Sequence, residues 1–595
     1  MRSMRLARVA IVALSVAAIP CLWEVAASGI WSGMTHKPFS PIGWYLALGW
    51  WNANWWCKFC LVVSAMFPTL ALLALVSCAI PFVYRRYRPG KLQRPANGGL
   101  RPIERGVTPN HGTAAWATAE QIKERFGAGN VLIGAQVRGG RDLISDDLSR
   151  GPGHSGIFAS PGSDKTATLI HRIWRYNKGP VVALDPSFEM AAVMTRALTN
   201  AGRKVHLIGP TMKDPKNPVF ANLGGINILD WIDLANPDVD ADILTAVEHI
   251  YDDKAKMKDG SQADPYWHQM GRNIVAALLG HMIYEPLMTK SMTWLRHGLS
   301  TSSKDLPGLL SKIAATSHSS TARFYAKRLD GLEKADRTWA SIMGALTAAT
   351  GWLANERYAE LVSNASMATD AILDSDTVVF VCIPLRTLRA TPALGRAIMG
   401  ALFNRVIHAD GEVPGIAKTF FALDEAATLR DMAELMDFHI TARKYRGAVQ
   451  LIYQSEAQLD RVWGKDDARV IRDSWSWRSH NAIQDGDIAE RLEKDLGRHG
   501  VMAYSEGTNR GRSKRFGFAL PSNSEGGNVN VHEIAVPLCS RAQILRLPAT
   551  KIIVHARDFP NPILAETAPY YLYPEVAQLM DKNRFVVERT PDPHE

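Results

Sequence analysis

The pattern of hydrophobic and polar positions divides the chain into an N-terminal part with two long apolar runs and a body with shorter ones. The first run extends from Val9 to Trp23 and fades near Ile30, and the second, Phe59–Tyr84, holds no charged residue. A helix needs about 20 apolar residues to cross a bilayer, so the second run is long enough and the first is marginal. We predict two transmembrane helices within residues 1–90, joined by a short periplasmic loop. A signal peptide ending after the first run is the alternative.

Basic residues flank this pair of runs on both outer sides, at Arg2, Arg5 and Arg8 before it and within residues 85–94 after it. The positive-inside rule then keeps both termini in the cytoplasm and predicts a multi-pass protein of the bacterial inner membrane. Residues 1–94 carry ten Lys and Arg and one acidic residue, and thus nine of the ten net positive charges of the chain. The basic balance therefore reflects membrane topology and is no argument for nucleic-acid binding.

The body alternates short apolar runs with helical patterns, which predicts an α/β fold with a parallel sheet. Helical periodicity alone dominates from about Asp230 to Met367. We expect this stretch to be an all-helical insertion between strands of one sheet. The polar, Gly- and Ser-rich segment Ser505–Asn530 is predicted to be a loop. We predict a membrane anchor at residues 1–90. A nucleotide-binding domain follows in two halves, residues 91–229 and 367–595, and the inserted domain, residues 230–366, lies between them.

The segment Ala159–Thr166 has the spacing of a phosphate-binding loop between a strand and a helix. Such a loop binds phosphate because backbone amides and a helix N-terminus point at one volume. Lys165 would bind the outer phosphates of ATP, and the Thr166 hydroxyl would bind Mg²⁺. Ala159 and Asp164 replace the two glycines of the motif. An ordinary strand-to-helix turn, with Asp164 as the helix cap, is the alternative. The residues predicted to bind the nucleotide are Gly162, Ser163, Asp164, Lys165 and Thr166.

The segment Thr419–Ala426 is an apolar strand that ends in two carboxylates. Such a pair can hold magnesium and activate a water, so we assign Asp424 to the metal and Glu425 to catalysis. Gln454 ends the next predicted strand and would sense the phosphate or position the water. The alternatives are a solvated strand end and a surface glutamine. Together the two segments predict a nucleotide-driven motor, with Lys165 and Glu425 as neighbours.

An ordered set of short motifs across nearly the whole chain resembles the type IV coupling proteins of conjugation and type IV secretion, the TraG/TraD-like membrane ATPases. The set comprises the two apolar runs, His111–Ala117, His154, Asp185-Pro186 with Glu189, Asn227–Leu229, Pro265–Trp267, Leu423–Ala426, Gln454–Leu459 and Trp463-Gly464.

The resemblance implies a RecA-like P-loop ATPase that assembles as a homo-hexamer at the inner membrane. It also implies ATP and Mg²⁺ as cofactors. The implied partners are a relaxase–DNA complex or effector proteins, which are the substrates, and the type IV secretion channel that receives them. Arg443 lies where this family has an arginine that could act as a catalytic finger in a neighbouring subunit. A solvated arginine at a helix end is the alternative.

Two departures from the family pattern weaken the expected nucleotide site. The family has Gly-Lys where this chain has Asp164-Lys165, and Lys-Gly where it has Ser187-Phe188. A carboxylate about 4 Å from a phosphate costs roughly 4 kcal/mol at an effective dielectric constant near 20. ATP hydrolysis is thus in doubt, and a non-hydrolysing substrate receptor is one alternative function. An FtsK-like DNA pump is another, which the presence of two apolar runs instead of four disfavours.

A basic and aromatic cluster within the predicted loop could contact single- or double-stranded DNA in a pore, or be a solvated loop. It comprises Arg510, Arg512, Lys514, Arg515, Phe516 and Phe518.

Overall fold

The computed structural model separates into two compact units, residues 106–500 with 534–595, and residues 1–105 with 501–533. For residues 504–530 it describes at most the backbone. The described residues are 25–35, 40–41, 48, 55–56, 58–66, 68–69, 104–105, 109–137, 142–148, 153–177, 179–210, 223–252, 264–364, 366–409, 418–441, 444–513 and 522–584.

Within the described residues, the larger unit contains a sheet of eleven strands in the order β3-β2-β14-β13-β10-β4-β9-β8-β5-β7-β6. The strands from β10 to β6 run parallel, and the four at the other end pair antiparallel. The central strands read as continuous apolar runs because helices cover both faces of a parallel sheet. The strands are β2 Val131–Gln136, β3 Leu143–Asp146, β4 Ser155–Ala159, β5 Val181–Leu184, β6 Lys204–Ile208, β7 Thr377–Val381, β8 Thr419–Leu423, β9 Gly447–Tyr453, β10 Trp477–Asn481, β13 Lys551–Ala556 and β14 Ile563–Glu566.

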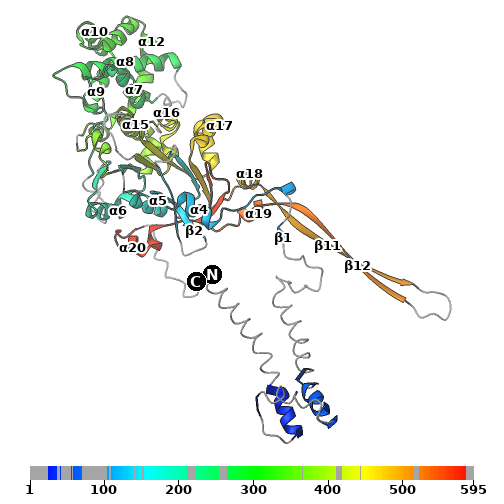
Figure 1. Cartoon of the computed structure of the whole chain (residues 1–595). Coiled ribbons are helices and arrows are strands. Elements are labelled where there is room, and N and C mark those ends of the chain that lie inside the picture. Colours follow the sequence, from blue (N-terminus) through cyan, green and yellow to red (C-terminus); the bar gives the residue numbers. More distant parts are fainter. Residues whose placement is uncertain are drawn as a thin grey trace. The chain divides into compact units, whose positions relative to one another are not determined.

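Helices follow most of the parallel strands, and this α/β alternation was predicted (Figure 1). Helix α5 follows β4 and helix α6 follows β5, so both begin at the carboxyl edge of the sheet. The helices of this part are α4 Ala119–Phe126, α5 Lys165–Arg175, α6 Glu189–Asn200, α14 Leu385–Ala390, α15 Pro392–His408, α16 Ala433–Thr441, α17 Glu456–Ser474, α18 Gly486–Leu496, α19 Arg541–Ile544 and α20 Pro574–Ala577.

Between β6 and β7, from residue 239 to residue 361, the described regular elements are helices (Figure 1). The longest, α8, begins with Asp264 as its cap, since the Asp264 carboxylate accepts a hydrogen bond from the Tyr266 amide. The α-helices of this segment are α7 Val239–Ile250, α8 Pro265–Tyr284, α9 Met292–Leu299, α10 Leu306–Thr316, α11 Ser320–Arg328, α12 Asp336–Thr350 and α13 Glu356–Leu361.

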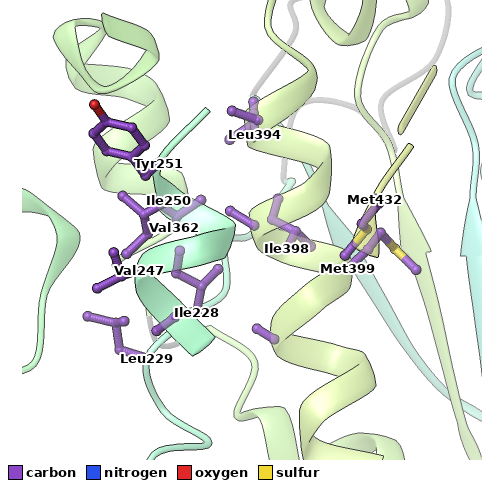
Figure 2. Close-up of a cluster of buried hydrophobic side chains, with 14 of the residues drawn as sticks. Ile228, Leu229, Val247, Ile250, Tyr251, Val362, Leu394, Ile398, Met399 and Met432 are labelled. Carbon is purple, nitrogen blue, oxygen red and sulfur yellow. The ribbon is translucent and has the colours of Figure 1, made fainter. Parts of the chain in front are cut away.

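The helical segment shares a hydrophobic core with the sheet part of the unit (Figure 2). Val247 and Ile250 of α7 belong to the same buried cluster as Leu394 and Ile398 of α15, a helix that follows the insertion in the chain. The same buried cluster includes Val449 of β9. Apolar burial, the main driving force of folding, therefore ties the helices to the sheet.

The smaller unit corrects the prediction of a loop at residues 505–513 and 522–530, which are strands; residues 514–521 of the predicted loop lie outside the described residues. Strands β11 Arg498–Ser513 and β12 Ser522–Pro537 pair with each other, and β1 Glu104–Arg105 pairs antiparallel with β11. Gly and Ser are poor strand formers, so the composition favoured a loop. Backbone pairing between strands formed this sheet in spite of the composition.

The two predicted membrane spans lie mostly outside the described residues. Val9–Trp23 falls wholly outside them, and residues 58–66 and 68–69, which overlap the second run, are helical. None of the described helices is both long enough and apolar enough to cross a membrane.

Candidate nucleotide site

The phosphate-loop segment lies between β4 and α5, as a strand–turn–helix unit. Gly162 has a φ of +77°, and a Cβ at this position would meet no atom within 4 Å outside its chain neighbours. Ser163 is buried, and its hydroxyl donates to the Ser160 carbonyl at 2.6 Å. Asn481 of β10 donates through its side-chain amide to the Ser163 carbonyl at 3.3 Å. The turn is thus held from within and from a neighbouring strand.

Asp164 adopts a left-handed backbone conformation, with φ 54° and ψ 24°. This region suits glycine, and a residue with a Cβ pays a steric cost there. The Asp164 carboxylate forms no cap hydrogen bond to α5. The structure therefore contradicts the alternative in which Asp164 caps this helix by its side chain.

Lys165 and Thr166 at the start of α5 meet the two carboxylates after β8. The Lys165 ammonium lies 2.8 Å from Glu425 Oε1 and 3.8 Å from Asp424 Oδ1. The Thr166 hydroxyl donates to Asp424 Oδ2 at 3.2 Å. Parallel strands end at the same edge of a sheet, and β4 is separated from β8 by β9 alone. Residues 260 positions apart in the chain are therefore neighbours.

Gln454, which follows β9, completes this group. Its side-chain amide donates to both Glu425 oxygens, at 3.2 and 3.3 Å. Glu425 itself has a left-handed φ of 58°. Such backbone strain is kept where the surroundings fix the residue, and it is common at functional sites. The two hydrogen bonds fix the direction in which the Glu425 carboxylate points.

Burial and opposite charges act against each other in this group. Burial raises the pKa of Asp424 above its usual value, and the positive charge of Lys165 only partly offsets this. Burial lowers the pKa of Lys165, but Asp424 and Glu425 outweigh it and leave that pKa raised. Lys165 thus stays protonated at neutral pH. A buried carboxylate beside a cation is stable only if the charges remain paired.

Two observations fit this site to a nucleotide with a divalent cation. Asp424 Oδ1 is buried and has no hydrogen-bond partner among the described residues. None of the backbone amides of residues 164–166 donates a hydrogen bond to a described residue. Carboxylate and hydroxyl oxygens suit magnesium, and amides at a helix start suit phosphate. Thr166 and Asp424 could hold the metal, and the turn with Lys165 could hold the phosphates.

A buried arginine supports α5 from behind. Arg172 donates to the Leu132 and Ile133 carbonyls of β2 and, at 2.6 Å, to Gln450 Oε1. Gln450 in turn donates to the Ser155 hydroxyl at 2.9 Å. Burial lowers the pKa of Arg172 to about 9, which still leaves it charged at neutral pH. This network connects the helix that carries Lys165 with three strands of the sheet.

A second strand–turn–helix unit lies at the same edge, between β5 and α6. Asp185 is fully buried and accepts hydrogen bonds from the Glu189 amide at 3.1 Å and the Ala191 amide at 2.8 Å. Phe188 has a φ of 62° and is buried in the core. Ser187 donates to Asp185 at 3.1 Å. The residue in place of the family lysine is thus turned toward the chain's own carboxylate.

The sequence did not single out Asp185, Glu189 or Asn583 as site residues. The first two belong to a motif of the family resemblance, which was the available signal. Asn583 donates to Glu189 Oε1 at 2.8 Å across 394 positions, and no local pattern could reveal that contact. Arg443 lies outside the described residues, and so do the side chains of the basic cluster at residues 510–518.

The comparisons with known proteins agree with the geometry. Residues 115–592 match the family described as type IV secretory system conjugative DNA transfer. The chain belongs to this family. The resemblance drawn from the short motifs is therefore confirmed, and with it a place among the coupling proteins of conjugation or type IV secretion.

Curated relatives support this placement. The chain is 27% identical to the type IV secretion system-coupling protein VirD4 of Bartonella henselae, over 82% of this chain and 77% of the relative. It is also 27% identical to the probable conjugal transfer protein TraG of Sinorhizobium fredii, over 76% and 71% respectively.

Solved structures confirm the fold. The unbound conjugative coupling protein TrwB superimposes with a TM-score of 0.55 at 17% identity, over 80% of this chain and 95% of that one. TrwB solved with the ATP analogue ADPNP gives 0.54 at 16% identity, over 80% and 96%. The similarity shows a mixed α/β P-loop fold. TrwB has also been solved with ADP and Mg²⁺.

Proposed function

We propose that this chain is an ATP-driven coupling protein that recruits a DNA or protein substrate and passes it to a type IV secretion or conjugation channel. The observation that carries the proposal is the convergence of Lys165, Thr166, Asp424, Glu425 and Gln454 at one edge of the sheet. Family membership supplies the process in which such a motor works. The TrwB structures with ADPNP and with ADP and Mg²⁺ support the choice of ligand.

The proposed roles follow from the contacts. ATP with Mg²⁺ supplies a phosphoanhydride whose cleavage drives movement. Lys165 would bind the outer phosphates, and Thr166 and Asp424 would hold the metal. Glu425 would orient and polarise the attacking water, and Gln454 keeps its carboxylate in place. Lys165 must leave Glu425 to bind a phosphate, so phosphate binding also frees Glu425 for the water.

Asp164 favours a second candidate function, a receptor that binds substrate without hydrolysing ATP. Its carboxylate stands in the phosphate turn and makes no cap hydrogen bond to α5. The lysine expected after Asp185-Pro186 is also replaced, by Ser187. Both changes reduce the positive potential that phosphate requires. The two functions differ in one measurable property, which is turnover.

The test uses the full chain in detergent with Mg²⁺ and a fluorescent ATP analogue, and measures both affinity and phosphate release. We expect binding and slow turnover in the unmodified chain. Lys165→Ala should abolish binding, and Glu425→Gln should keep binding while turnover falls by about 10² to 10⁴. If Glu425→Gln hydrolyses ATP as fast as the unmodified chain, the assigned roles are wrong. If neither the unmodified chain nor Asp164→Gly binds nucleotide, the receptor function replaces the motor.

We further propose that residues 9–23 and 59–84 anchor the chain in the inner membrane with both termini in the cytoplasm. Six copies would form the active motor, and Arg443 would act on the site of a neighbour. The distribution of basic residues supports the topology. Reporter fusions at Pro41 and after Arg94 should report opposite compartments. Fusions that report the same compartment would contradict this topology.

A further inference from the structure

Glu189 follows strand β5, the neighbour of the strand that leads to Asp424 and Glu425. It is the first residue of α6, directly after the turn that follows β5. Strands β5 and β8 are neighbours in register, with Leu184 opposite Leu423. The turn before Glu189 and the Asp424–Glu425 pair therefore leave the sheet side by side.

The C-terminal segment, residues 579–584, holds Glu189 in this position. Asn583 donates to Glu189 Oε1 at 2.8 Å. The Asp581 amide donates to the Val193 carbonyl at 3.0 Å, and Arg196 pairs with the Asp581 carboxylate at 2.7 Å. The C-terminal segment thus runs along α6 and is fixed to it at several points.

Among the described residues at this edge, the carboxylates of Glu189, Asp424 and Glu425 are accompanied by two cations, Lys165 and Arg584. Among the described residues Glu189 has no ion pair within 4 Å, while Lys165 is already bound to Glu425. Burial raises the pKa of Glu189, and the negative charge of Asp424 adds to this, against the opposing effects of Asn583, Arg584 and Lys165. The buried Asp424 Oδ1 accepts no hydrogen bond from the part of the chain that the structure describes, and the Lys165 ammonium lies 3.8 Å from it. An excess of negative charge beside a carboxylate oxygen that accepts no hydrogen bond fits a divalent cation.

We infer that Glu189 is a positioning residue of the magnesium–nucleotide site, where its charge stabilises a divalent cation held by Thr166 and Asp424, and that Asn583 keeps it in place. The inference rests on the proposed function and adds a residue to it. The competing explanation is purely structural, because an anion at a helix N-terminus stabilises that helix by about 0.3–1 kcal/mol. A helix-stabilising role would affect the protein equally with and without the metal.

The experiment separates the two by varying Mg²⁺ at a fixed concentration of fluorescent ATP analogue, with the full chain in detergent. Glu189→Gln should raise the Mg²⁺ concentration for half-maximal binding by about fivefold or more, since an interaction between charges is lost. The affinity for nucleotide without metal should stay the same or tighten. Asn583→Ala should shift the Mg²⁺ requirement in the same direction by less. Glu575→Gln, an exposed change on α20, is the matched control and should shift nothing.

The outcomes are distinct. If Glu189→Gln changes affinity by the same factor with and without Mg²⁺, or changes neither, the inference is overturned while the proposed function stands. If the unmodified chain and Asp164→Gly both lack Mg²⁺-dependent binding, the proposed function fails, and the inference fails with it. Asn583→Ala leaves the carboxylate in the chain, so it provides the test if Glu189→Gln does not fold.

Discussion

Two turns at one edge of the sheet have a similar backbone conformation but different hydrogen-bond partners. They are residues 160–164, before α5, and residues 185–188, before α6. Each follows a buried parallel strand and ends in a left-handed residue that starts a helix, Asp164 in the first and Phe188 in the second. Both residues stand where the family pattern has glycine. The left-handed conformation is therefore retained although the residue that adopts it at least cost has been replaced.

The difference lies in what satisfies the amides at the helix start. In the second turn Asp185 accepts hydrogen bonds from the Glu189 and Ala191 amides. The amides at the start of α6 are therefore satisfied by a carboxylate of the chain itself. In the first turn no side chain caps α5. Unfilled amides at a helix N-terminus attract an anion. One sheet edge thus carries a closed turn and an open turn, and only the open one suits phosphate.

The largest effect that we expect is a loss of stability when Phe188, in the closed turn, is replaced. Removing its buried ring should destabilise the protein by about 3–5 kcal/mol in Phe188→Ala, because a cavity remains in the core. Phe188→Gly should be less damaging than Phe188→Ala by about 1 kcal/mol, since glycine relieves the left-handed backbone. Urea denaturation of the two variants measures this order. The reverse order would contradict backbone strain at residue 188.

The next effect concerns the pH dependence that Asp185 imposes. Burial raises the pKa of Asp185 from 3.8 to about 7, so the folded chain holds this proton more tightly than the unfolded chain. The stability it contributes is present below the unfolded pKa and is lost as the pH rises through about 7. Asparagine does not titrate, so the Asp185→Asn variant does not lose this stability. The difference in unfolding free energy between the variant and the unmodified chain should therefore shift in favour of the variant between pH 4 and 7, by up to about 4 kcal/mol. Urea denaturation without divalent cations measures the difference, and a constant difference would mean that the helix amides keep Asp185 ionised.

A smaller effect sharpens the comparison at the open turn. Asp164→Gly should tighten ATP binding by more than about tenfold, or about 1.4 kcal/mol, because a carboxylate leaves the phosphate turn. Turnover should rise with it. Asp164→Asn is the control, since it removes the charge but keeps a residue that tolerates the left-handed region. If only the glycine variant improves, conformation limits binding; if both improve equally, the charge does. Unchanged affinity in both would contradict our account of this turn.

The smallest effect compares one hydroxyl in each turn. Ser163→Ala removes the hydrogen bond to the Ser160 carbonyl, worth about 1 kcal/mol, and should weaken nucleotide binding several-fold. Ser187→Ala removes the bond to Asp185 and should lower stability while leaving nucleotide affinity unchanged. Titration with the ATP analogue and thermal denaturation of both variants distinguish these results. Equal effects on affinity would show that both turns serve the nucleotide.

The sequence predicted the α/β class, because apolar runs of strand length alternate with helical patterns. It also predicted that Lys165 and Glu425 are neighbours, because the ends of parallel strands share one edge. The sequence could not predict the backbone conformation of Asp164. A polar residue before a helix indicates a cap, but Asp164 has a left-handed backbone conformation and its side chain does not cap α5. The hairpin β11–β12 was also missed, since Gly- and Ser-rich composition favours loops and the stabilising pairs are made along the strands. The Glu189–Asn583 contact depends on chain segments that only tertiary packing brings together.

The core that α7 shares with α15 limits how this chain can be recombined with its relatives. Helix α7 loses part of its buried cluster if residues 230–366 are transplanted without α15, which contributes Leu394 and Ile398 to that cluster. A chimera made to exchange substrate preference should therefore move α15 together with the helical segment. The unit of exchange extends through residue 408, past strand β7, and so includes part of the sheet itself.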